Sequence, residues 1–159
     1  MVILSEEEIG SLIQEPKPFP EGLSPLIKMS EFNKHRRKEI KVVCESGHEF
    51  VINVRQAVMA PMNFSVILAY ELPNFHRQFR LCRYNGKHEH TNPIEKHKFD
   101  CTHVHSATER YQELGGREDL FAMPDSRYYS LESAIQCFLA DCGFRPQFEN
   151  TPLGSGLQI

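Results

Sequence analysis

The sequence lacks the features that mark several large classes of protein. A formal net charge of −3 and a pI near 6.2 leave no basic excess of the kind that nucleic-acid coat proteins and membrane-surface proteins carry. No apolar run approaches the length of a membrane span. Acidic residues begin at Glu6, so no apolar signal core follows Met1. These absences predict a cytoplasmic protein without a membrane segment.

Common catalytic and nucleotide-binding motifs are also missing. The chain has no G-x-S-x-G, no P-loop, no G-x-G-x-x-G and no H-E-x-x-H. His88-Glu89-His90 is not the zincin motif, which needs two histidines four residues apart on a helix. The 5 cysteines show no C-x-x-C spacing and cannot all pair within one chain. We expect reduced thiols, most of them buried, as in other cytosolic proteins.

The length and the apolar content predict one domain. The 159 residues are 40% hydrophobic and include 11 phenylalanines, enough to fill a single core. We expect residues 1–145 to form this domain, with a proline-rich arm over residues 14–25. Residues 146–159 contain prolines and glycines without an apolar pattern, and we expect this tail to be disordered.

The apolar pattern predicts an α+β fold. Ser5-Glu6-Glu7-Glu8 is a capping box that opens a short N-terminal helix, and a second helix is expected from about Leu26 to Arg37. The middle of the chain alternates apolar and polar residues, which is typical of strands. The expected product is an antiparallel four- to five-stranded meander sheet, with strands near residues 40–44, 50–54, 64–70, 79–83 and 97–105. Asn85-Gly86 fits a tight hairpin or a bulge inside a longer strand.

Two C-terminal helices are expected to pack on this sheet. The first opens at a capping box beginning at Ser106 and stops at Gly115-Gly116. The second is capped by Ser130 and ends at Gly143. Its apolar stripe predicts a face packed on the sheet, or alternatively a partner-binding face; the stripe comprises Leu131, Ala134, Ile135, Phe138 and Leu139.

Most of the histidines are concentrated in one segment. Six of the 8 fall within residues 76–105, and they are His76, His88, His90, His97, His103 and His105. The two H-x-H pairs place their imidazoles on one face of a strand. A short hairpin turning near Asn92-Pro93 would set His103 near Arg83 or Tyr84, apart from the other pair. A longer connection would gather four imidazoles.

Three interpretations of this histidine segment follow. Four gathered imidazoles would suit zinc or another divalent metal, with His88, His90, His103 and His105 as ligands. The same four could instead catalyse phosphodiester cleavage without a metal, because histidine exchanges protons near neutral pH. In that case Arg83, Tyr84 and Arg110 would contact the substrate. The third interpretation is that several are surface histidines at a sheet edge or loop, with one satisfied in the core.

One stretch also resembles known sequences. Residues 79–86 (Phe-Arg-Leu-Cys-Arg-Tyr-Asn-Gly), the two H-x-H pairs and Thr108-Glu109-Arg110-Tyr111 resemble an uncharacterised family of small bacterial and phage-borne proteins. They are loosely similar to toxins of toxin–antitoxin pairs that carry an arginine-rich strand ahead of an H-x-H. The likeness covers roughly residues 40–142. It implies a bacterial or mobile-element setting and transfers no catalytic role.

The resulting hypothesis is a protein that binds or acts on nucleic acid, in the form of a toxin-like RNase centred on the four histidines. The first alternative is a non-enzymatic module of a defence or phage locus that binds a partner protein. The second is a divalent-metal-binding protein, for which zinc is the leading ion.

Overall fold

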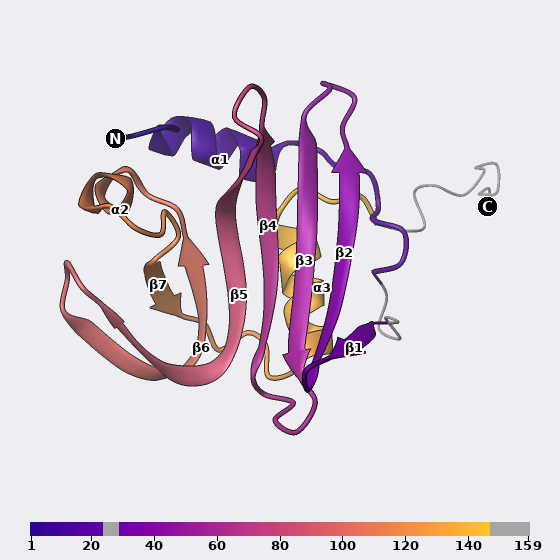
Figure 1. Ribbon diagram of the computed structural model, residues 1–159, viewed down its shortest axis with the longest axis vertical. Coiled ribbons are helices and arrows are strands. Elements are labelled where there is room, and N and C mark those ends of the chain that lie inside the picture. Colours follow the sequence, from indigo (N-terminus) through magenta and orange to yellow (C-terminus); the bar gives the residue numbers. More distant parts are fainter. Residues whose placement is uncertain (24–28, 147–159) are drawn as a thin grey trace, which may run out of the picture.

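The computed structural model describes residues 1–23 and 29–146. It is an α+β fold built on one antiparallel sheet, as expected, and every strand pairs with its neighbour in sequence (Figure 1). The sheet has seven strands, so the expected four to five was too low. The strands are β1 (Ser30–Phe32), β2 (His35–Val43), β3 (Glu49–Ala57), β4 (Phe64–Leu72), β5 (Arg77–Asn92), β6 (His97–Ser106) and β7 (Phe121–Pro124). The helices are α1 (Glu6–Gln14), α2 (Glu109–Leu114) and α3 (Leu131–Asp141).

The helix expected from Leu26 to Arg37 is wrong from residue 29 onward, and residues 26–28 lie outside the described residues. Strands β1 and β2 form a hairpin there, with Phe32 paired to His35. Its two turn residues, Asn33 and Lys34, have φ of 51° and 66°. Positive φ at both central positions is typical of the type I′ turn that joins two strands tightly. The charged residues 36–39 at the start of β2 show no alternation of apolar and polar side chains, because neither face of that end of the strand is buried. The alternation that marks a strand is therefore absent there.

Helices α1 and α3 pack on one face of the sheet. Alternate residues of β2, β3 and β4 point into this core, and α3 lies behind the sheet in Figure 1. Ser130 caps α3 through a capping box, as expected. The stripe of α3 faces the sheet as predicted; Leu131, Ala134, Ile135 and Phe138 are buried, and Leu139 is half-buried. The opposite face carries no helix among the described residues.

The arm after α1 is attached to the end of α3. Lys17 is fully buried, and its ammonium group donates to the carbonyl oxygens of Leu12, Ile13, Glu15 and Cys142 at 2.8–3.0 Å. Its backbone N–H donates to Gly143 O at 2.8 Å. One cation therefore satisfies the last carbonyls of both helices.

Helix α2 begins later than expected. Its N-cap is Thr108, whose hydroxyl accepts from Tyr111 N at 3.1 Å, and the capping box proposed at Ser106 is wrong. Ser106 ends strand β6, because pairing with Phe121 of β7 continues the strand up to that residue. The C-cap is Gly115, as expected.

Strand β5 is bent. Its pairing with β6 shifts between Asn85 and His88, so Asn85-Gly86 is a bulge inside a long strand and not a hairpin. A Cβ atom at position 86 would lie 1.8 Å from Met62 O. Strand β5 can therefore approach the loop between β3 and β4 this closely only with glycine at this position. Bulges bend a strand and increase its twist. Beyond the bulge, β5 and β6 curve away together and turn back toward β7 and α2 (Figure 1).

The expected disordered tail, residues 146–159, lies outside the described residues from residue 147 onward. Over the two described ranges, no helix has the length and apolarity needed to cross a membrane.

Candidate metal centre

The end of the β5–β6 hairpin is held back against the body of the protein. The Asn92 side chain is almost fully buried and bonds both backbone groups of Ala122 in β7: Nδ2 donates to O at 2.8 Å, and Oδ1 accepts from N at 2.9 Å. At the turn, the Tyr111 hydroxyl of α2 donates to Glu95 Oε1 at 2.6 Å and accepts from Ile94 N at 3.1 Å. These contacts close the bend, so its concave side is a fixed space.

All four candidate histidines meet on this concave side. The observed register is close to the short-hairpin alternative, with His103 opposite Asn85 and His105 opposite Arg83. We expected that register to separate the pairs, and this was wrong because the strands bend. The ring centroids of His88 and His90 lie 4.6 and 5.5 Å from that of His103, and His90 lies 4.7 Å from His105.

Hydrogen bonds fix the orientation of three of the rings. Nδ1 of His103 donates to the Cys101 carbonyl at 2.7 Å, and Nδ1 of His105 donates to the Asp119 carbonyl at 2.8 Å. The Asn92 Oδ1 atom, whose identity follows from the Ala122 pairing, accepts from Nε2 of His90 at 2.9 Å. Each ring therefore has one nitrogen lone pair that faces away from its oxygen partner: Nε2 of His105, Nδ1 of His90, and Nε2 of His103, which has Asn85 Nδ2 at 3.5 Å.

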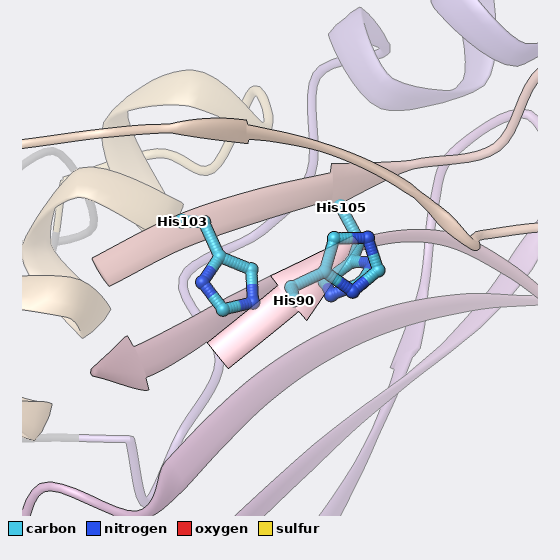
Figure 2. Close-up of side chains that lie close together, drawn as sticks. All are labelled: His90, His103 and His105. Carbon is cyan, nitrogen blue, oxygen red and sulfur yellow. The ribbon is translucent and has the colours of Figure 1, made fainter. Parts of the chain in front are cut away.

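These three rings form the candidate metal centre. One ring nitrogen from each of His90, His103 and His105 lies within 4.8 Å of the others, and Figure 2 shows the rings facing one another. Bonds of about 2.0–2.1 Å to tetrahedral zinc put ligand nitrogens roughly 3.3 Å apart. Around a bound ion, the widest of these nitrogen separations must therefore shorten by up to roughly 1.5 Å. The donor set fits zinc or a similar divalent ion.

Burial keeps the inner histidines neutral. Burial, together with the neighbouring imidazoles, lowers the pKa of His103 to about 4 and that of His105 to about 3. The pKa of His88 is also lowered, by burial and then by His90 and Arg55. Neutral imidazole is the form that binds a metal.

A pocket of about 470 Å³ opens beside His90 and His105. Arg55, Arg83 and Arg117 line it together with histidines of the cluster. Asp119, which is fully buried, connects these groups: its carbonyl holds His105, and its carboxylate accepts from Arg83 Nη2 at 2.7 Å and from Arg117 Nε at 3.3 Å. One carboxylate thus faces two guanidinium groups, and the wall of the pocket keeps an excess of positive charge.

Asn85 adds an unsatisfied acceptor to the pocket. Its side chain is 6% exposed and lines the space, with Nδ2 donating toward His103 Nε2 at 3.5 Å. Its Oδ1 is buried without a hydrogen-bond partner among the described residues. Such an atom is costly in a folded protein unless something else satisfies it.

Two of the residues expected to contact substrate lie elsewhere. Tyr84 points to the opposite, helix-covered face, where its hydroxyl donates to Asp141 Oδ2 at 2.6 Å. Arg110 lies on α2 and pairs with Glu95 at the hairpin turn. Arg83 is the one predicted contact that reaches the pocket. Adjacent residues of a strand point to opposite faces of the sheet, so Tyr84 and Arg83 could not both have faced the substrate. This could have been predicted from the sequence.

Sequence reasoning missed Arg55, Asn92 and Asp119. Arg55 follows the core residue Val54, so its side chain lies on the helix-free face of the sheet. Its position beside the histidines depends on how β3 pairs with β4 and how β4 pairs with β5, which the sequence does not show. Asn92 was assigned only to a turn. No local signal identifies Asp119, which acts through a loop between α2 and β7.

Comparison with known proteins places the chain in a family without assigning an activity. Neither a curated protein nor a solved structure matches it. A family model described as a family of unknown function matches residues 4–143, which include every residue of the candidate metal centre. The resemblance to an uncharacterised family is thereby confirmed: the chain belongs to DUF6978, a family of unknown function.

Proposed function

We propose that the protein is a divalent-metal-dependent phosphodiesterase whose metal ligands are His90, His103 and His105. One observation carries this proposal. Each of the three imidazoles donates one N–H to a fixed oxygen, and one ring nitrogen of each lies within 4.8 Å of the others. Metal-ligating histidines characteristically have such an oxygen partner, which fixes the tautomer and orients the ring.

Burial of the two inner histidines argues against a metal-free mechanism that uses them as proton donors. In that role at least one of them would have to be protonated near pH 7. The pKa of His103 is about 4 and that of His105 about 3, so fewer than about one ring in a thousand is charged at that pH. For these two rings we therefore favour the metal-binding alternative, with zinc as its leading ion.

The other pocket residues have separate roles in this proposal. A divalent ion with three protein ligands supplies a Lewis acid and lowers the pKa of a coordinated water. Arg83 and Arg117 hold the non-bridging oxygens of the phosphodiester. Exposed His88, neutral and 4.6 Å from His103 by ring centroids, accepts a proton from a water whose oxygen bonds to phosphorus. The bond from phosphorus to the leaving alkoxide breaks, and the alkoxide takes a proton from solvent.

Nucleic acid is the phosphodiester that this proposal favours, in agreement with the hypothesis from the sequence. A toxin-like RNase of a bacterial or phage locus is its narrower form. The interaction module is the alternative, and it differs in one measurable respect: partner binding by a module is insensitive to removal of the histidine cluster.

Metal uptake by chelator-treated protein tests the first half of the proposal. We expect titration calorimetry with Zn²⁺ and Mn²⁺ near pH 7.5 to give one site per chain. His90→Ala should weaken binding at least 100-fold, because it removes one of three ligands without emptying the core. His97→Ala is the matched control, since His97 is an exposed histidine of the same hairpin outside the centre. Equal affinity in wild type and His90→Ala would contradict the metal centre.

Hydrolysis tests the second half. We expect the metal-loaded protein to cleave bis(p-nitrophenyl) phosphate, the chelated protein to be inactive, and added metal to restore activity. Arg83→Gln should raise KM more than it lowers kcat, because this residue binds the phosphate and leaves the metal ligands in place. Stoichiometric metal uptake without any phosphodiester cleavage would refute the enzyme and leave a metal-binding protein.

A further inference from the structure

A row of polar side chains crosses the helix-free face and ends at the metal centre. Pairing between neighbouring strands puts Arg37 opposite Arg55, Arg55 opposite Ser65, Ser65 opposite Asn85, and Asn85 opposite His103. Residues directly opposite on paired strands point to the same face. Four spacings of about 4.8 Å make the row about 19 Å long. This row runs across the strands, from the β2 side of the sheet to the histidines.

The far end of the row carries two arginines, Arg37 and Arg55, and Glu39 is the acidic residue that lines the same pocket. Arg80 and Arg83 bind the buried Glu118 and Asp119. By contrast, among the described residues Arg37 and Arg55 form no ion pair, and Arg55 contacts only His35 Nδ1 at 3.2 Å and Asn63 Oδ1 at 3.4 Å. Burial, and next the charge of Arg37, lower the pKa of Arg55. Like charges placed directly opposite on a sheet cost stability, which an anionic ligand would offset.

Two pockets make the row continuous. A larger pocket of about 820 Å³ lies over β2–β5 and is lined by Arg37, Arg55 and Arg83 among others. Arg55 and Arg83 also line the pocket at the histidines. The two spaces therefore share a wall, and one elongated anion can occupy both.

An exposed aromatic side chain stands beside the far end of the row. Phe32 in β1 pairs with His35, which is two residues from Arg37 on the same face. Its side chain is 70% exposed. An aromatic ring next to unpaired arginines is the combination with which proteins stack a base and hold its phosphate.

From these observations we infer that a single strand of nucleic acid binds along this row, with Arg37 and Arg55 on its phosphates and Phe32 stacked on a base, and that it delivers one phosphodiester to the metal centre. A length of about 19 Å accommodates about five nucleotides at 3.4 Å per stacked nucleotide. An unpaired strand suits the row better than a duplex, because the stacking contact requires an exposed base face. This inference deepens the proposed function and rests on it.

Fluorescence anisotropy in excess chelator tests strand binding separately from the metal. The probe is a labelled oligouridylate of about 12 nucleotides, roughly twice the length of the row. Arg37→Gln and Arg55→Gln should each weaken binding about tenfold and lower the slope of log K against log salt by about 1. Phe32→Ala should weaken binding without changing that slope, since stacking releases no counterions.

Arg36→Gln is the matched control. Arg36 is exposed and adjacent on the same strand, but alternation turns it away from the row. We expect its variant to bind as wild type does, so an equal loss in Arg36→Gln would overturn the inference. It would also be overturned by equal affinity for poly-glutamate of matched charge, which would indicate an acidic protein partner. Tighter binding of a duplex of the same length would contradict the single strand. Oligodeoxyuridylate in a parallel titration identifies the sugar.

The two proposals fail in distinguishable ways. Strand binding by chelated protein that takes up no metal would refute the phosphodiesterase and retain the row as a nucleic-acid site. Metal uptake and cleavage of the small diester without oligonucleotide binding would refute the row and retain the enzyme.

Discussion

The buried histidines should make the metal-free protein acid-labile between pH 7 and pH 5. His103 and His105 are 0% and 3% exposed, and their pKa values are lowered to about 4 and about 3 from an ordinary value near 6.5. The unfolded chain therefore binds more protons than the native state below pH 6.5. By linkage, the contribution of these groups to stability is complete above that pH and is lost as the pH falls toward the folded values.

The magnitude follows from the proton affinities. At pH 5 each unfolded imidazole is almost fully protonated while each native imidazole is almost fully neutral, which costs about 2 kcal/mol per group at 1.36 kcal/mol for each pKa unit. Between pH 7 and pH 5 the free energy of unfolding should thus fall by roughly 4 kcal/mol. That is a large part of the 5–15 kcal/mol typical of a domain. The lowered pKa values of Glu15, Glu118, Asp125 and Asp141 put their own titration below this range.

Urea unfolding of chelated protein at several pH values measures the effect. Because burial raises the pKa of neighbouring Asp119 and so acts in the opposite sense, the decisive quantity is the difference between variants. His105→Gln should lose only about half as much stability as wild type between pH 7 and pH 5, since one of the two groups is gone. His97→Gln is the control and should follow wild type. Parallel pH profiles for wild type and His105→Gln would refute the assignment of buried neutral imidazoles.

Two further predictions concern the scaffold of the site. Gly86→Ala should destabilise the protein by about 1–3 kcal/mol or more in urea unfolding, because the new Cβ would lie 1.8 Å from Met62 O. Gly10→Ala, in a helix with nothing within 4 Å of the added carbon, should instead be neutral or stabilising. Phe138→Ala should cost about 3–5 kcal/mol, since the ring is fully buried under the sheet. A loss below about 1 kcal/mol would contradict the packing of α3 on the sheet.

The parts of the fold that were predictable from sequence are those with a local period. Apolar alternation identified β3 and β4, and the cap at Ser130 with its stripe identified α3 correctly. All three residues of β1 are exposed, so the strand has no alternation of apolar and polar residues by which it could have been predicted. The start of α2 was misplaced because Ser106 and Thr108 are both possible N-caps, and only pairing with β7 decides between them.

The candidate site shows the same division between local and non-local information. The four histidines were identified because H-x-H fixes a common face on one strand. We expected the four imidazoles to gather only in the register with the longer connection. In the observed register a flat hairpin would keep His90 far from His105. The bend supplies the missing proximity, and it depends on Gly86 approaching Met62 and on Asn92 reaching β7. Neither contact has a signature in sequence.

The bent hairpin also has a consequence for kinetics. His90 lies beyond the bulge, whereas His103 and His105 lie on the part of β6 that pairs with β7. The docked turn, held by Asn92 and Tyr111, is therefore what joins the two halves of the metal centre. Undocking of the turn is a local opening that leaves the central sheet paired, so it needs less free energy than global unfolding. The lifetime of a bound ion should accordingly be set by how often the hairpin opens, and a metal that bridges the two arms would in turn slow that opening.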